Sequence, residues 1–283
     1  MLTRTDGSLH LNPPITALLR GVTWLEVIVL FIAGGGLLVN MALIVGIWPW
    51  PLRPFNLRFL GAIYSAALVS AIWQAVIGRW APSRAVTWMI FVFTAVVTVL
   101  SFVHIGSFDF KRVEVWVWFV LYVGVCVNAG VHLAWPRGLR RVVGTPPSAG
   151  WRLALLAQAA VCGAIGLAHL LMPAWAGARW PWPIDVFHAQ LYSVAFLTPA
   201  VAALCLRRAT TGMDWWAQGT TQLAWGLLPI VGLVLADAGA KRVDWTSAAA
   251  LLWLAIYAGL ACVGAAMLLE ARRSPGAPMH RSR

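Results

Sequence analysis

The chain has 283 residues, of which 61% are hydrophobic and 11% are charged, and its mean hydropathy is +0.79. Soluble domains carry about 25% charged residues, so this composition argues against a water-soluble enzyme. The formal net charge is +12, but the charged residues lie in short clusters between long apolar runs and form no exposed basic stripe for phosphate. The sequence therefore predicts an integral membrane protein with no nucleic-acid partner.

Eight apolar runs are each long enough to cross about 30 Å of hydrocarbon. They lie near residues 24–48, 55–80, 85–108, 114–136, 151–175, 186–207, 215–237 and 246–270. The first run is expected to be a retained anchor entered from Arg20, since no short apolar core with a small-residue cleavage site precedes it. The predicted fold is all-α, with eight transmembrane helices and no soluble domain.

Basic residues predict the orientation. With the N-terminus inside, fourteen of the 21 Lys and Arg residues fall on the inner side and seven on the outer side. The outer seven are Arg53, Arg58, Lys111, Arg112, Arg179, Lys241 and Arg242. Inner loops carry the excess of Lys and Arg, so both termini are expected to be cytoplasmic. An Arg-rich, Lys-poor chain without an organelle signal favours a bacterial inner (plasma) membrane.

The chain also repeats itself. Residues 48–71, which begin WPWP, align without a gap on residues 180–203, and KRVE at 111–114 recurs as KRVD at 241–244. Because four spans separate the copies, the two halves share one orientation, related by an axis along the membrane normal. The predicted segments are a cytoplasmic N-terminal segment 1–23, a first four-helix repeat 24–136, a cytoplasmic linker 137–150, a second repeat 151–270 and a basic cytoplasmic tail 271–283.

The chain is tryptophan-rich, with 18 Trp, and the two WPWP turns contribute Trp48, Trp50, Trp180 and Trp182. Alternating Trp and Pro make a stiff, extended connection. Its rings either form a platform for a hydrophobic ligand or anchor each half at the membrane interface. The sequence leaves both interpretations open.

Basic side chains share the outer face with these turns. Arg58, about one turn into the second span, is either a clamp for an anionic group or an arginine that snorkels to the interface. The candidate ligand-binding set is Trp48, Trp50, Arg58, Lys111, Arg112, Trp180, Trp182, Lys241 and Arg242. The leading hypothesis is a polytopic membrane protein that binds, or transports, a lipophilic small molecule or a membrane partner at its outer-leaflet face. No catalytic motif is present, so an enzyme is not the expected class.

Three outer-side histidines support an alternative hypothesis from another class. His104, His169 and His188 are candidate ligands for a metal or haem iron, with Asp185 placed to orient His188. The interpretation without a metal is that these histidines form hydrogen bonds with water or backbone groups. It is favoured because no HxxxH or HExxH spacing is present. The alternative is a haem- or metal-binding redox membrane protein.

Two further polar features lie in the first half of the chain. Glu26 lies two residues into the first predicted span and is expected to be an interfacial group near Arg20. Asn128 and His132, spaced i, i+4, share one face of the fourth span. They either line a cavity and relay a proton, or bond a neighbouring helix.

Overall fold

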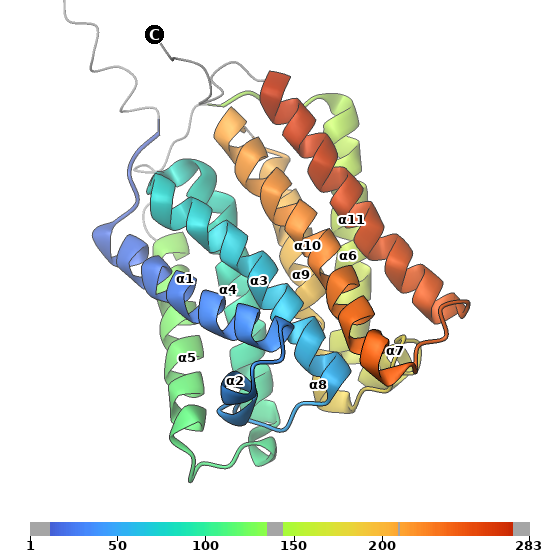
Figure 1. Cartoon of the computed structure of the whole chain (residues 1–283). Coiled ribbons are helices and arrows are strands. Elements are labelled where there is room, and N and C mark those ends of the chain that lie inside the picture. Colours follow the sequence, from blue (N-terminus) through green and yellow to red (C-terminus); the bar gives the residue numbers. More distant parts are fainter. Residues whose placement is uncertain (1–11, 135–143, 209, 274–283) are drawn as a thin grey trace, which may run out of the picture.

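The chain folds as a bundle of long helices in the computed structural model, which describes residues 12–134, 144–208 and 210–273 (Figure 1). The long helices are α1 (Ala17–Leu38), α3 (Pro54–Ile77), α4 (Trp80–Val103), α5 (Val113–Ala134), α6 (Ala149–Leu171), α9 (Val194–Leu206), α10 (Gly212–Ala240) and α11 (Ala248–Arg273). The short elements are α2 (Ala42–Gly46), a 3-10 turn (Ile105–Ser107), α7 (Pro173–Gly177) and α8 (Val186–Leu191). Within the described ranges eight segments are long and apolar enough to cross a membrane, with α8 and α9 together making one of them. The predicted number of spans is confirmed.

The first span differs from its predicted bounds. Helix α1 begins at Ala17, earlier than the expected start at residue 24, because the Thr16 side chain accepts a hydrogen bond from the Leu19 N–H and caps the helix. It ends at Leu38, and Asn40 then adopts a left-handed backbone with φ of 61° before α2 begins. Glu26 is consequently the tenth residue of α1, about 14 Å along the helix axis, and does not lie at the start of the span.

Two central helices organise the packing. Helix α3 packs against α1 and α10, and α9 packs against α6 and α4. Helices α5 and α11 then pack on α4 and α10 and lie at opposite sides of the bundle (Figure 1). Every long helix is therefore joined directly or through one neighbour to the pair α3 and α9.

The peripheral helices expose large apolar side chains. Phe31 on α1, Val120 on α5 and Leu153 on α6 are each 69% exposed, and Leu252 on α11 is 63% exposed. In water such a surface would drive aggregation, whereas against lipid tails it costs nothing. The exposed apolar belt and the eight long segments together make this a multi-pass integral membrane protein.

Close packing and buried polar bonds hold α1, α3 and α4 together. A Cβ atom on Gly61 of α3 would lie 2.3 Å from the Leu38 nitrogen, so only glycine permits this approach of α3 to α1. The Gln74 amide donates to Thr23 Oγ1 at 2.8 Å, and Thr87 Oγ1 donates to Gln74 Oε1 at 3.0 Å. These bonds satisfy polar groups that have no access to water.

The start of α1 and the end of α11 lie at the same end of the bundle (Figure 1). This agrees with an even number of spans. Residues 1–11, 135–143 and 274–283 lie outside the described residues, and they include much of the predicted N-terminal segment, linker and tail. The assignment of this end to the cytoplasm stays a prediction.

Candidate functional site

The first half of the bundle encloses a cavity of about 480 Å³ between α1, α3, α4 and α5. Its wall is almost entirely apolar and aromatic, and it extends from Trp48, beyond α2, to the level of Glu26 in α1. Two side chains of the second half, Thr198 and Trp225, close its inner side. A cavity of this size accommodates a drug-sized molecule.

The cavity exists because α1 and α5 meet at one end and diverge at the other. At the meeting end, Thr16 Oγ1 lies 2.6 Å from Nε2 of His132 in the last turn of α5. Toward α2 the two helices separate (Figure 1). Part of the cavity wall is also exposed on the outside of the bundle: Leu25 and Ile32 on α1, and Val113 and Val117 on α5. The cavity therefore opens at the lipid-facing surface between α1 and α5. His132 thus bonds a neighbouring helix as the interhelical interpretation expects, whereas the side-chain amide of Asn128 is buried without a hydrogen-bond partner among the described residues.

Glu26 places a carboxyl group in this apolar wall. The residue is 9% exposed, and its Oε1 atom is buried without a hydrogen-bond partner among the described residues. The expectation of an interfacial group near Arg20 is wrong, because Arg20 instead donates to the carbonyl oxygens of Ala75 and Val76. Only the position of Glu26 within the longer α1 could have indicated this from sequence.

Two phenol groups form the other polar feature of the wall. The hydroxyl groups of Tyr64 on α3 and Tyr122 on α5 lie 2.6 Å apart and satisfy each other. The hydroxyls of Ser70 and Thr94, which also line the cavity, donate to backbone carbonyls of their own helices. Glu26 is thus the wall carboxyl without a partner, since Glu114 at the cavity mouth lies 3.6 Å from the Arg112 guanidinium.

The corresponding region of the second half is filled. When the gap-free register of the WPWP turns is continued along the chain, it pairs Gly226 of α10 with Thr94 of α4. A Cβ atom on Gly226 would lie 2.4 Å from the Ala261 nitrogen, so α10 and α11 are in backbone contact there. The same register pairs the bulkier Trp225 with Phe93 of the cavity wall. At these two positions of the second half, backbone contact and a larger ring occupy more volume than Thr94 and Phe93 do in the first.

Gln158 is the residue that this register pairs with Glu26. Its side chain exchanges two hydrogen bonds of 3.0 and 2.8 Å with Gln222 and donates to the Pro199 carbonyl at 3.2 Å. Gln222 in turn is paired with Ile90, which lines the cavity. The second half therefore has a neutral, satisfied side chain where the first half has an unpartnered acid.

The four WPWP tryptophans are buried in the connections that follow α2 and α7, each 8% exposed or less. Within each turn the two rings meet edge to face, with centroids 5.4 Å apart in Trp48–Trp50 and 5.3 Å apart in Trp180–Trp182. Of the four, Trp48 lines the cavity. The turns are part of the core and do not present an exposed platform.

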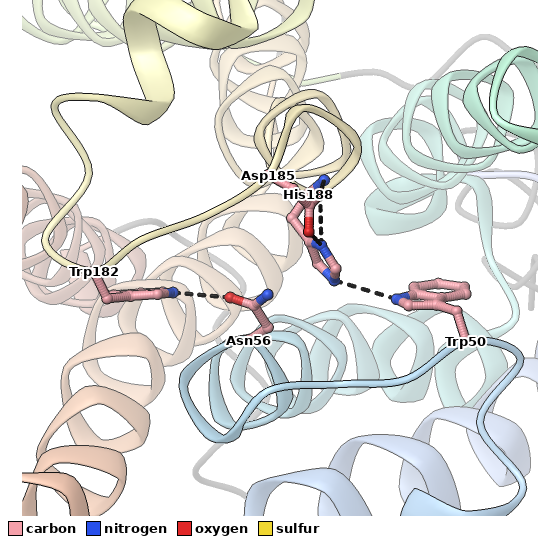
Figure 2. Close-up of polar contacts among 5 residues, drawn as sticks. All are labelled: Trp50, Asn56, Trp182, Asp185 and His188. Atoms are coloured by element: carbon pink, nitrogen blue, oxygen red, sulfur yellow. Dashed lines mark hydrogen bonds and ion pairs between the residues drawn. The ribbon is translucent and has the colours of Figure 1, made fainter. Parts of the chain in front are cut away.

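Reciprocal hydrogen bonds join the two turns to the opposite halves. Trp50 Nε1 donates to His188 Nε2 at 3.2 Å, and Trp182 Nε1 donates to Asn56 Oδ1 at 2.9 Å (Figure 2). The alignment of the turns pairs His188 with Asn56 and Trp182 with Trp50. The same donor position in each half thus binds the same acceptor position in the other half.

Asp185 completes this contact outside the membrane-spanning segments. Its carboxylate accepts the hydrogen bond from His188 Nδ1 at 2.8 Å and also caps α8 by accepting the His188 N–H. The hydrogen bond from the His188 side chain lowers the pKa of Asp185 to about 2. Because an indole N–H can only donate, Nε2 of His188 accepts and Nδ1 carries the hydrogen.

The basic residues of the predicted ligand-binding set lie in different environments. Arg58 donates to the Leu38 carbonyl and ties α3 to the end of α1. Arg112 donates to the carbonyl oxygens of Trp48 at 3.0 Å and Gly46 at 2.9 Å, which secures the cavity mouth. The remaining members of the predicted set, Lys111, Lys241 and Arg242, are exposed.

The three histidines are each engaged in a different set of contacts. His104 Nε2 lies 2.6 Å from Gln190 Oε1, and His169 Nδ1 lies 2.9 Å from the Ile165 carbonyl. His169 Nε2 is buried without a partner between the rings of Trp180 and Phe196. In the part of the chain that the structure describes, no group of three His, Cys, Asp or Glu side chains could hold a metal ion. Metal or haem binding by these histidines stays a prediction.

The fold and the cavity define a polytopic helical membrane protein with an internal apolar chamber. Comparisons with models of known families, with curated proteins and with solved structures found no match to this chain. The site is therefore the basis for its function.

Proposed function

We propose that this protein binds a lipophilic small molecule in the cavity of its first half and admits it from the bilayer between α1 and α5. The observation that carries the proposal is an apolar chamber of about 480 Å³ whose wall reaches the lipid-facing surface. A chamber of this kind excludes water-soluble ligands, because its wall offers few polar groups to replace their hydration. Carriage of the molecule across the membrane is a variant of the same activity.

The proposed site differs in position from the outer-leaflet face at which the sequence-based hypothesis expects the ligand. Trp48 and Arg112 belong to its mouth. Trp50, Trp180 and Trp182 act instead in the contact between the halves. In this proposal the doubled WPWP turns hold the two halves together, and the ligand lies deeper, inside one of them.

The proposed architecture is a tandem duplication of two parallel four-helix repeats, 24–136 and 151–270, with both termini cytoplasmic. Three observations support the duplication. The first helix of each half is capped at equivalent positions, by Thr16 and by Ser148. The helix pairs α1–α3 and α4–α5 have counterparts in α6–α9 and α10–α11. The Trp50–His188 and Trp182–Asn56 bonds exchange partners between halves, as a two-fold axis requires.

A cavity-filling variant tests the binding proposal. Ala67 of α3 lines the cavity and is partly buried, so Ala67→Phe places a ring in the chamber. The probes are dehydroabietylamine and dehydroabietol, tricyclic compounds that share one skeleton and differ in the polar group. Equilibrium binding to the protein in lipid nanodiscs is expected for at least one of them, and Ala67→Phe is expected to weaken it about tenfold or more.

The matched control is Ala164→Phe, which adds the same ring to an exposed position of α6. Its affinity for the probes is expected to equal that of the unmodified protein. If neither probe binds the unmodified protein, or if both variants bind alike, the proposal is wrong.

A further inference from the structure

The acidic and basic residues in the cavity lining are acidic only, whereas the chain as a whole has an excess of basic residues. The protein carries 21 Lys and Arg residues against 9 Asp and Glu. The cavity wall nevertheless contains two glutamates, Glu26 and Glu114, and its described lining includes no Lys, Arg or His. The lining therefore offers an occupant carboxyl groups and no basic side chain.

Of the two acids, Glu26 is the one available to an occupant. Glu114 has the Arg112 guanidinium as its neighbour. Glu26 is nine-tenths buried, and its Oε1 atom accepts no hydrogen bond. A buried carboxyl group without a partner is costly, and a hydrogen-bond donor that carries positive charge removes that cost most fully.

Aromatic rings supply the rest of a cation site. Trp48, Tyr64, Phe93, Trp118 and Tyr122 all line the chamber. The negative face of an aromatic ring attracts ammonium groups, and the attraction is largest where water is excluded. The indole N–H of Trp48 is buried without a partner, and as a donor it does not compete with Glu26 for an ammonium group.

The second half shows that an unpartnered acid is not a requirement of the fold. At the equivalent position Gln158 is neutral and is satisfied by Gln222 and the Pro199 carbonyl. In the first half, Ile90 replaces Gln222 and removes the side-chain partner, while the carbonyl of Ala67, which stands where Pro199 does, accepts from Ser70 Oγ. The open chamber and the unpartnered acid therefore occur together in one half only.

From these observations we infer that the occupant of the cavity is a lipophilic amine, whose ammonium group binds Glu26 while its hydrocarbon skeleton fills the aromatic chamber. This inference rests on the proposed function and specifies the chemical class of the ligand. It assigns Glu26, the first-half counterpart of Gln158, as the residue that determines specificity.

The experiment compares three compounds with one tricyclic skeleton: dehydroabietylamine, dehydroabietol and dehydroabietic acid. Their equilibrium affinities are measured in nanodiscs for the full chain and for Glu26→Gln, which keeps the shape of the side chain. The control is Asp109→Asn, which removes one negative charge from an exposed residue outside the cavity. Thermal unfolding of each variant confirms that it is folded.

The amine is expected to bind about tenfold tighter than the alcohol and tighter still than the acid. Glu26→Gln is expected to reduce amine affinity to that of the alcohol and to leave alcohol affinity unchanged, whereas Asp109→Asn has no effect. Equal binding of amine and alcohol to the unmodified protein would overturn the inference while the proposed function stands. Absence of binding by all three would overturn both. Even if Glu26→Gln does not fold, the affinities of the three compounds for the unmodified protein decide whether the cavity prefers an amine.

Discussion

At the scale of single residues, His188 shows how one side chain joins the two halves of the bundle. Nδ1 of its ring is hydrogen-bonded to Asp185 of its own half, and Nε2 accepts from Trp50 of the other half. The Asp185 carboxylate selects the tautomer that leaves Nε2 free to accept. Asn56 performs the equivalent acceptor role for Trp182 without needing a carboxylate, since an amide oxygen is always an acceptor.

We expect Trp50→Phe to lower the free energy of unfolding by about 1–3 kcal/mol, because it leaves the buried Nε2 of His188 without a donor. The measurement is thermal unfolding in detergent. The control is Trp116→Phe, which removes a bond from an exposed Trp116 to the Phe110 carbonyl. Equal destabilisation by the two variants would contradict the importance of the Trp50–His188 bond.

The Asp185 contact predicts a pH window. The pKa of Asp185 is lowered from 3.8 to about 2, so its stabilising contribution is fully present above about pH 4 and is lost as the pH falls through 2. Asp185→Asn is therefore expected to lower the unfolding midpoint equally at pH 7 and pH 5, with a difference that shrinks only below pH 4. The effect is below about 1 kcal/mol, because the Asp185 side chain is 59% exposed and screened by solvent. A difference that disappeared between pH 7 and pH 5 would refute this assignment.

At the scale of elements, the contrast between α4 and α10 determines where space remains. Gly226 lets α10 contact the backbone of α11, whereas Thr94, which the proposed duplication pairs with Gly226, lines the cavity. Close approach of membrane helices depends on small residues, since lipid tails compete equally for apolar contact. Gly219, Gly226 and Gly264 together allow the close contact of α10 and α11.

Gly226→Ala is expected to destabilise the protein by about 1–3 kcal/mol, since the added Cβ atom would lie 2.4 Å from the Ala261 nitrogen and force α10 from α11. The matched control is Gly163→Ala in α6, where nothing lies within 4 Å of the added atom. That change is expected to be neutral or slightly stabilising, because alanine favours helix. Denaturation in detergent measures both, and equal midpoints would contradict the close packing of α10 and α11.

At the scale of the whole molecule, the orientation in the membrane is the property that the basic residues predict. The start of α1 and the end of α11 share one end of the bundle (Figure 1). The distribution of Lys and Arg assigns that end to the cytoplasm. In a bacterial host, green fluorescent protein fused after Arg283 is expected to fluoresce, and alkaline phosphatase fused after Asp244 is expected to be active. The reverse result would show that the orientation is inverted.

The proposed duplication explains why one half can differ in chemistry. The second half retains paired amides and tight helix contacts at Gln158 and Gly226. The first half has an acid and an open wall at the same positions, Glu26 and Thr94. Two copies with a shared framework allow one copy to maintain stability while the other forms a site.

Much of the architecture was predictable from local pattern. Hydrophobic length alone predicts eight spans, because a spanning helix must satisfy its backbone internally over a fixed thickness. The predicted start at residue 24 failed, since the apolar pattern weakens before Trp24 while the Thr16 cap, a single side-chain contact, starts the helix at Ala17. That error moved Glu26 to the interface and concealed the buried acid.

The sequence by itself determined the membrane class, the number of spans and the matching of equivalent positions in the two WPWP turns, because these depend on composition, length and order along the chain. Only the tertiary structure decided that the WPWP rings are buried between the halves and that α1 and α5 diverge around a chamber. It also decided that Glu26 lacks a partner. These properties depend on distances between helices, which packing of small and large side chains sets and which no periodicity along one helix encodes.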